Sequence, residues 1–243
     1  MSQFVRALFI SRKDMESYYS KPPLVTWGLL FPAVLMLAVY VKDPSNYLGV
    51  APGVIAMTLL FGNTSMAAIV VTFEKRSGTL QRLLLAPISH RTILLGKACS
   101  AALYGVATSL VLTVGLSLLL RMPIVNPLLL VAALILGAGA FSLLGLAVSA
   151  SVREVFEAMT LLNFFRFPIL FISGVFIPVA HLPTWAKPVA MLSPLTHVVE
   201  LFRFGLSGQA YFASPAIPAA TSVGFLVVSW ILAEQAFRRR ANQ

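Results

Sequence analysis

The sequence predicts an all-α integral membrane protein, and its composition is the first reason. Of its 243 residues, 58% are hydrophobic and only 11% are charged, with a mean hydropathy of +0.89, whereas soluble domains carry about 25% charged residues. A compact soluble body of this size has to cover itself with polar groups that this chain lacks. We therefore expect lipid to surround most of the chain.

Six apolar runs, each long enough to cross a bilayer, are the second reason. A helix needs about 20 apolar residues to cross a hydrocarbon core about 30 Å thick. The runs cover residues 24–41, 52–73, 98–120, 128–151, 158–179 and 216–233. We expect them to form one transmembrane domain over residues 1–243, with both chain ends on the same side.

The distribution of basic residues predicts which side that is. If the N-terminus is cytoplasmic, thirteen of the 18 Lys and Arg residues fall in inner segments and four in outer segments, and Arg166 lies within the fifth run. Lys and Arg in short loops resist translocation. We therefore expect both termini in the cytoplasm.

Residues 1–23, which precede the first run, are expected to form an interfacial helix. An apolar stripe at helical spacing comprises Phe4, Leu8, Met15 and Tyr19. Basic side chains that can reach anionic headgroups are Arg6, Arg12 and Lys13. This pattern is typical of a helix that lies in the membrane plane; a frayed basic tail is the alternative.

The first four runs are separated by residues that end helices. The first run follows Pro22 and Pro23 and stops before Pro44, and the third and fourth runs are separated around Pro123. Proline lacks the backbone donor that a helix interior requires and restricts the residue before it. These positions are therefore expected turns.

The inner loop 74–97 is predicted to contain a short amphipathic helix. Ser77 or Thr79 can cap its start, and Pro87 limits it to about two turns. Its apolar face consists of Leu80, Leu83 and Leu84 at i, i+3 and i+4. That face can dock in a groove on a soluble partner or lie on the bilayer surface, and the residues alone leave both open.

The fifth run carries a charge inside the membrane. Arg166 costs roughly 2.5 to 3.5 kcal/mol near the bilayer centre. It can face an anionic cargo, pair with Glu154 or Glu157, or extend to the headgroups. Three of the phenylalanines around it, expected to form an aromatic wall of a pathway or to face lipid, are Phe164, Phe165 and Phe171.

Between the fifth and sixth runs, the outer segment 181–215 is too interrupted by proline to cross the membrane. We expect re-entrant or interfacial helices there, with Trp185 at the membrane interface. A polar stripe at i, i+3 and i+6 consists of His197, Glu200 and Arg203. This stripe is expected to face water or a partner charge.

Two stretches carry a family resemblance. FEKRSGTLQRLLLAPISHRTILLGK follows the second run, and FISGVFIPVAHLPTWAKPVAMLSPLTHVVELFR lies between the fifth and sixth. In sequence and order, both resemble the permease subunits of type-2 ABC exporters, as does the six-span layout with both ends inside. The resemblance implies a multi-pass permease of a prokaryotic cytoplasmic (inner) membrane, moving a hydrophobic or amphiphilic cargo such as a drug, lipid or glycolipid outward. A polysaccharide or lipid-linked glycan cargo is the alternative.

By this resemblance, loop 74–97 holds the coupling helix that seats in an ABC ATPase subunit, and the inner loop between the fourth and fifth runs makes a second contact. The residues implied are Glu74, Gly78, Thr79, Leu80, Leu83, Leu84, Pro87, Glu154 and Glu157. Gln81 stands where many relatives carry an acidic residue. Two copies of the chain would pair as a homodimer above two ATPase subunits.

No catalytic or metal site is expected in this chain. The only Gly-Lys pair, Gly96-Lys97, precedes Ala98 rather than Ser or Thr, so the P-loop pattern is not met. ATP and Mg²⁺ would therefore bind to the partner ATPase. The remaining alternatives are a membrane-embedded lipid-modifying enzyme that uses Glu154 and Glu157, and an anchoring protein that recruits an ATPase without transport.

Overall fold

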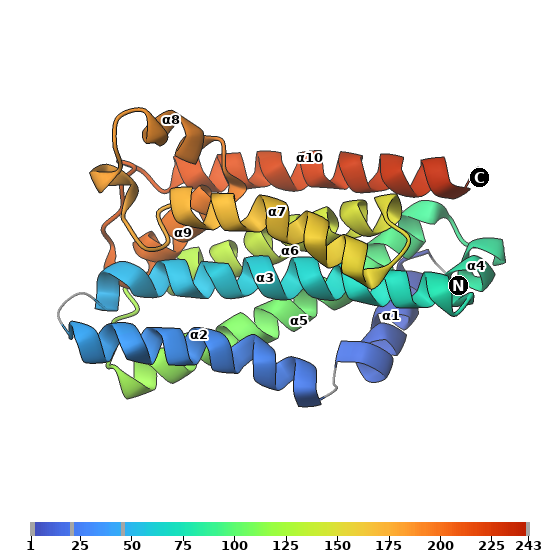
Figure 1. Ribbon diagram of the computed structural model, residues 1–243, viewed down its shortest axis with the longest axis horizontal. Coiled ribbons are helices and arrows are strands. Elements are labelled where there is room, and N and C mark those ends of the chain that lie inside the picture. The colour runs from blue at the N-terminus through green and yellow to red at the C-terminus, as the bar shows by residue number, and fades with distance from the viewer. Residues whose placement is uncertain (1–2, 20–21, 45–46, 242–243) are drawn as a thin grey trace.

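A computed structural model describes residues 3–19, 22–44 and 47–241, and this part of the chain is helical without strands (Figure 1). Side chains are not described for residues 22–28 and 240–241. The first helices are α1 (Gln3–Asp14), a π-helical turn η1 (Met15–Tyr19), α2 (Pro22–Lys42), α3 (Tyr47–Arg76), α4 (Thr79–Leu85) and α5 (His90–Leu119). They are followed by α6 (Pro127–Ser151), α7 (Val155–Ile172), a 3₁₀ turn η2 (Val179–His181), α8 (Ala186–Met191), α9 (Pro194–Ser207) and α10 (Ala216–Ala241). The predicted all-helical class is confirmed for the described residues.

Five of the described helices are long and apolar enough to cross a membrane, namely α3, α5, α6, α7 and α10. In α2, only Leu29–Lys42 forms a shorter apolar helix among the described residues. The predicted first span, 24–41, lies partly in the stretch whose side chains are not described. The expected number of six spans therefore stays a prediction.

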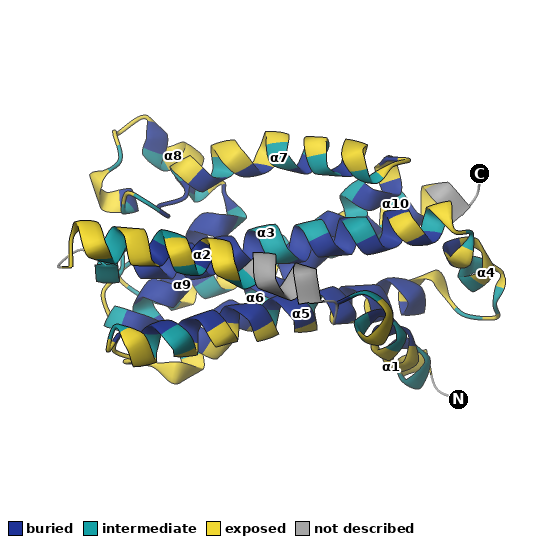
Figure 2. Ribbon diagram, turned by 60° about the horizontal axis from the view of Figure 1, so that its bottom comes forward, coloured by how far each residue is buried: buried dark blue, intermediate teal, exposed yellow. Residues whose placement is uncertain are grey.

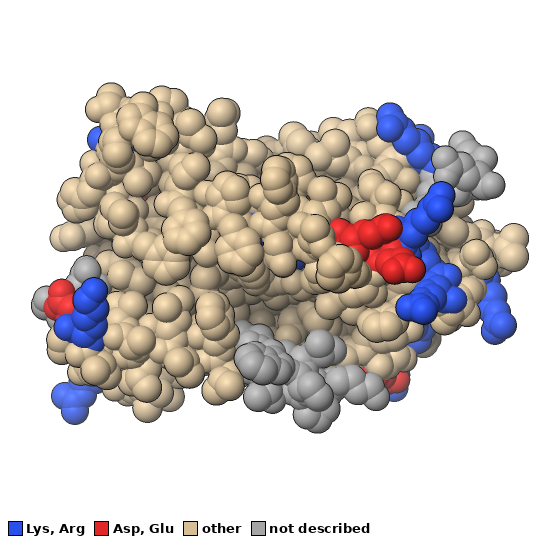
Figure 3. Space-filling model, viewed as in Figure 1, with Lys and Arg blue, Asp and Glu red and all other residues tan. Residues whose placement is uncertain are grey.

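The spans are arranged as a bundle with distinct ends. In Figure 1, α8 and α9 lie at one end, while α1, α4 and both chain termini lie at the other. Charged side chains on the face in Figure 3 also gather at the two ends, and a broad uncharged belt separates them. This distribution is the one expected of a chain whose middle faces lipid.

Helix α6 lies at the centre of the bundle and packs on α3, α5, α9 and α10. Small residues allow this close approach. A Cβ at Gly145 would come within 2.5 Å of the backbone oxygen of Thr64 on α3. As a result of this close packing, α3 and α6 are largely buried, whereas the outer sides of α2 and α7 are exposed (Figure 2).

The fifth span ends earlier than predicted. The apolar run continues to residue 179, but α7 stops at Ile172, and Gly174 turns the backbone into the left-handed region with φ of 77°. Glycine adopts this conformation without the steric cost of a Cβ. The expected end of the fifth span was wrong because the apolar run continues through the turn that Gly174 makes, so hydrophobicity alone does not reveal that turn.

Local capping explains where the next helices begin. Ser89 accepts a hydrogen bond from the backbone N–H of Thr92 at the start of α5, Asn126 accepts from Leu129 in front of α6, and Ser193 accepts from Leu195 in front of α9. These side chains satisfy backbone donors that have no partner in the first helical turn.

Candidate functional site

Helix α4 projects from the end of the bundle that carries both termini (Figure 1). It follows Gly78, whose φ of 72° reverses the chain after α3, and no side chain caps it. The expected capping by Ser77 or Thr79 was wrong, since these two hydroxyls lie 2.9 Å from each other instead. The helix ends at Leu85, two residues before Pro87, close to the predicted length of two turns.

The predicted apolar face of α4 packs on the protein itself. Leu80 is only 4% exposed and belongs to a core cluster that includes Leu94 of α5, and Leu84 packs against the same cluster. Leu83 is half-buried. Neither expected use of this face, on the bilayer or on a partner, fits Leu80, because intramolecular packing already covers it.

The exposed face of α4 is a different set of residues. Gln81 and Arg82 are exposed, and Leu85 is 87% exposed. We call Gln81, Arg82 and Leu85 the α4 outer face. An exposed leucine beside a cation, on a helix held rigidly by Leu80, is a surface on which another protein could dock.

Helix α1 supports this region from the side. Its residues Ala7 and Ile10 pack on α5 so closely that a Cβ at Gly96 would come within 2.8 Å of both. The guanidinium of Arg6 donates to the backbone oxygen of Pro87, just after α4, and Thr92 donates to Gln3 over 2.8 Å. The described part of the segment is therefore an ordered helix, whereas its position in the membrane interface stays a prediction.

Four charged side chains meet beneath α4, and we call them the charge cluster. Lys13 contacts Asp14 over 2.9 Å and also contacts Glu74, while Lys97 contacts Asp14 over 3.2 Å and also contacts Glu74. Asp14 and Glu74 are fully buried and Lys97 is 1% exposed. The cluster joins α1, α3 and α5, and it is electrically balanced, as buried charges generally have to be.

The electrostatics of Lys13 follow from these contacts. Partial burial disfavours its charged form, but hydrogen bonds to Glu74 and Asp14 outweigh that effect and raise its pKa. The nearby phenol of Tyr19 is buried against Tyr104, with ring centroids 5.4 Å apart, and burial raises its pKa. At neutral pH, Lys13 therefore stays charged and the phenol of Tyr19 stays neutral.

The structure changes the expectation for Glu74. It was expected to contribute to the partner-binding loop, yet α3 continues to Arg76 and turns this carboxylate into the charge cluster. Sequence reasoning missed Asp14 and Lys97 altogether. For Lys97 the available signal was its position directly before an apolar run. α3 continues to Arg76 and α5 begins at His90, so Glu74 and Lys97 both belong to helices and not to the loop between them.

The second inner loop has a different character. Glu154 and Glu157 are both exposed, and the Glu157 carboxylate accepts a hydrogen bond of 2.9 Å from the backbone N–H of Arg153. Glu157 therefore stabilises the first turn of α7. The loop lies at the same end of the bundle as α4 (Figure 1), and its contact with a partner stays a prediction.

Arg166 and the phenylalanines of α7 point in different directions. Phe164, Phe165 and Phe171 are exposed, whereas Arg166 is 3% exposed and lies 5.1 Å from the ring centroid of Phe61 on α3. Its nearest hydrogen-bond partner is Asn163, at 3.4 Å. Pairing with Glu154 or Glu157 and extension to the headgroups are both inconsistent with this position.

The polar stripe of α9 faces the protein interior. His197, Glu200 and Arg203 are all buried. Glu200 accepts a hydrogen bond of 2.6 Å from the backbone N–H of Tyr211, and Arg203 donates over 2.8 Å to the backbone oxygen of Gly174. The expected orientation towards water was wrong, since the stripe holds the flanking loops; Trp185, by contrast, is 75% exposed.

Burial governs the protonation of this stripe. It lowers the pKa of His197 and of Arg203 and raises the pKa of Glu200, and the hydrogen bond from Tyr211 opposes the last shift. His197 also shares a hydrogen bond of 2.9 Å with the backbone oxygen of Met191. This hydrogen bond joins α9 to α8.

Comparisons with known proteins agree with this arrangement. The family described as ABC-2 type transporter matches residues 6–206. The chain is 25% identical to the putative transport permease ycf38 of Cyanophora paradoxa, over 88% of this chain and 79% of that protein. It is 23% identical to the inner membrane transport permease YadH of Escherichia coli strain K12, over 82% and 81% of the two chains. The probable multidrug ABC transporter permease YbhR of the same strain is 28% identical over 63% of this chain and 42% of its own length.

Proposed function

The chain belongs to the ABC-2 type transporter family as a permease subunit, and from this premise we propose that it exports a hydrophobic or amphiphilic cargo, driven by a separate ABC ATPase. In this proposal, two copies form the pathway, two ATPase subunits bind below them, and ATP and Mg²⁺ bind to the ATPase. Both termini and α4 lie in the cytoplasm, as the basic residues predict.

The observation that carries the proposal is the α4 outer face. Leu85 is too exposed for a side chain that serves the chain's own core, and Arg82 adds a positive charge next to it. A groove with an acidic rim on the ATPase would bury the leucine and pair with the arginine. Leu80 and Leu84 hold α4 against a core cluster that α3 and α5 share, so movement of the docked ATPase would be transmitted to the bundle.

The charge cluster supports the same role. It connects α1, α3 and α5 through buried ion pairs, near the end of α3 from which α4 follows. A rigid base of this kind would move as a unit when the ATPase subunits close. Glu74 would therefore act through the position of the loop rather than by direct contact with the partner.

The exposed phenylalanines of α7 support an apolar cargo. Phe164 and Phe171 in particular face away from the chain's own core, where a second copy or a cargo would contact them. The description of YbhR as a probable multidrug permease agrees with such a cargo.

The test is ATP hydrolysis by the assembled complex. The chain is co-expressed with its ATPase, and the double variant Arg82→Glu/Leu85→Asp is compared with wild type in membranes. We expect the double variant to lose co-purification and transport-coupled hydrolysis by about tenfold or more, as for a central interface residue. The matched control is Leu192→Asp, which changes an equally exposed leucine at the other end of the bundle.

Unchanged hydrolysis and co-purification in the double variant would contradict docking through α4. Leu80 and Leu84 are unsuitable for this experiment, because their substitution would also destabilise the core cluster.

A further inference from the structure

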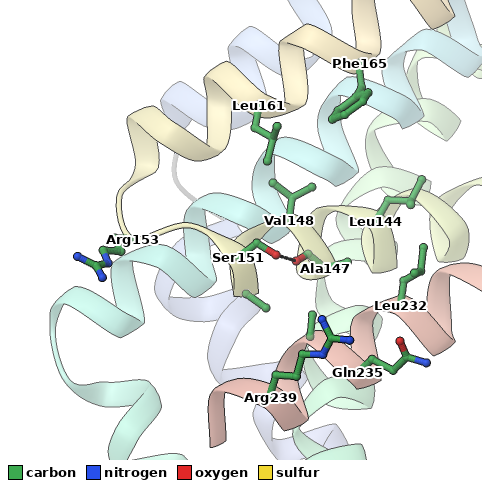
Figure 4. A pocket seen from close by; sticks show the side chains of 12 residues that line it. Leu144, Ala147, Val148, Ser151, Arg153, Leu161, Phe165, Leu232, Gln235 and Arg239 are labelled. Atoms are coloured by element: carbon green, nitrogen blue, oxygen red, sulfur yellow. Dashed lines mark hydrogen bonds between the residues drawn. The ribbon is translucent and has the colours of Figure 1, made fainter. Parts of the chain in front are cut away.

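A groove lies between α6, α7 and α10 at the end of the bundle that carries α4. Its volume is about 670 Å³, and it is open along one side. In Figure 4, α6 forms its floor, with α7 on one side and α10 on the other. It exists because α7 packs mainly on α3, whereas α10 packs mainly on α6.

The groove has an apolar part and a polar part. The apolar part is lined by Leu144, Val148, Leu161, Phe165 and Leu232. The polar part lies where α6 ends and is lined by Ser151, Arg153, Gln235 and Arg239. Figure 4 shows Arg239 extending from α10 towards α6, whereas Arg153 lies at the rim, on the loop before α7, with its side chain directed outward.

The charge in the groove has one sign. Two arginines line it, and no carboxylate is found among the described residues of its lining. The hydroxyl of Ser151 is satisfied by the backbone oxygen of Ala147, at 3.3 Å. By contrast, the neighbouring Arg238 pairs with Glu234 over 2.7 Å. The carboxylate of Glu157 lies next to the backbone of Arg153, just outside the groove. Among the described residues, however, neither the Arg153 nor the Arg239 guanidinium forms an ion pair, so both charges remain available to a ligand.

We propose that this groove binds a membrane phospholipid with an anionic headgroup. The acyl chains would lie along α6 and α7 against the leucines and Phe165. The phosphate would bind to Arg239 at the polar end, and Arg153 would add positive charge at the rim. A phospholipid matches this arrangement, because its charged headgroup would lie at the polar part of the groove while its acyl chains lie along the apolar part. A second copy of the chain would have to bring a carboxylate to the arginines and an apolar side chain to the floor.

The polar end lies at the depth where headgroups are found. The loop that carries Arg153 joins two helices that are long and apolar enough to span the membrane, and Arg239 lies near the end of a third. Basic side chains just outside a span attract anionic lipid. The proposal is independent of the exporter assignment, because it concerns a resident lipid and not the cargo.

The test is native mass spectrometry of the purified full-length chain in detergent. The protein is titrated with phosphatidylglycerol and with phosphatidylcholine of identical acyl chains. We expect wild type to bind the first phosphatidylglycerol more tightly than phosphatidylcholine. Each of Arg153→Gln and Arg239→Gln is expected to reduce that preference about fivefold. The matched control is Arg238→Gln, which removes the same charge one residue away and should keep the preference.

A second variant tests the shape of the groove. Ala147 lies on the floor, and Ala147→Trp should reduce binding of both lipids without changing the preference for one headgroup. If neither arginine variant alters the preference, the proposal is wrong.

A disulfide experiment examines the competing occupant. Gln235→Cys is introduced into a Cys99→Ser background, since Cys99 is the only native cysteine. Efficient disulfide formation between two copies in the membrane would show that a second copy covers the groove, which would also overturn the proposal. These readouts do not involve ATP, so they separate this proposal from the proposed export function.

Discussion

The carboxylate of Glu74 lies between the ammonium groups of Lys13 and Lys97, shielded from solvent. A buried ion pair contributes little net stability when complete, but removing one partner leaves the other charge uncompensated. The charge cluster is therefore sensitive to single neutral substitutions and more tolerant of paired ones.

The first prediction concerns this residue. Glu74→Gln is expected to destabilise the protein by about 3 to 5 kcal/mol, because it leaves two cations facing one carboxylate. The measurement is thermal unfolding in detergent. The double variant Glu74→Gln/Lys97→Gln should recover part of the loss. As a control, Glu16→Gln removes an exposed ion pair with Arg12 and should change stability by less than about 1 kcal/mol. A single variant as stable as wild type would contradict the buried cluster.

His197 supplies a prediction about pH. Burial lowers its pKa below the ordinary value of 6.5, so below that pH the unfolded chain binds more protons than the folded one, and stability falls as pH decreases. Glu200 acts in the opposite direction at lower pH, because its pKa is raised. Thermal unfolding at pH 7.5 and 5.5 should show a smaller loss in His197→Phe than in wild type.

The control for this experiment is His181→Phe. His181 is exposed, so this variant should keep the pH dependence of wild type. If His197→Phe loses as much stability on acidification as wild type, the buried histidine does not contribute to the pH dependence.

At the scale of elements, α1 and α4 are positioned by neighbouring helices rather than by their own sequences: α1 packs on α5, and α4 packs on a core cluster of α3 and α5. An isolated helix of seven residues such as α4 is not stable in water, and its inward leucine has to be buried elsewhere. α3 and α5 provide that surface together, through Val70, Val71 and Leu94, and α5 also provides the close contact at Gly96 on which α1 lies.

Gly96→Val tests the contact between α1 and α5. The new side chain would collide with Ala7 and Ile10 and should destabilise the protein by about 1 to 3 kcal/mol, as overpacking does. It should also expose Ser11, which is buried on α1, so Ser11→Cys in a Cys99→Ser background should react faster with a maleimide.

Gly115→Val is the matched control on the same helix, because a Cβ there meets no atom within 4 Å. It should have little effect on stability or on labelling. Equal effects of the two valines would indicate general disturbance of α5 and not displacement of α1.

At the scale of the whole molecule, the two ends of the bundle have different functions in our proposal. One end carries the α4 outer face, the charge cluster and the groove, whereas the other carries α8 and α9 with their buried polar stripe (Figure 1). The orientation of these ends in the membrane rests on the basic residues.

Cysteine labelling in whole cells tests that orientation. In a Cys99→Ser background, Trp185→Cys should react with a membrane-impermeant maleimide from outside, and Gln81→Cys should react only after permeabilisation. Both positions are exposed, so accessibility alone does not distinguish them. The reverse pattern would place α4 outside the cell and contradict docking of a cytoplasmic ATPase.

The sequence by itself determined the helical membrane class, the family and the approximate extent of the helices, because these depend on long apolar runs and on local breakers such as Pro87 and Pro123. The same apolar pattern could not show that α7 stops at Ile172, before the turn at Gly174, or that α3 continues past its run as far as Arg76.

Only the tertiary structure decided which faces are used. Leu80 and the α9 stripe were expected at a surface but lie inside, and Gln81, Arg82 and Leu85 remain exposed on α4. The charge cluster and the groove also depend on residues far apart in the chain. Periodicity tells which residues share a helix face, whereas the neighbour that covers that face is determined by how distant segments pack.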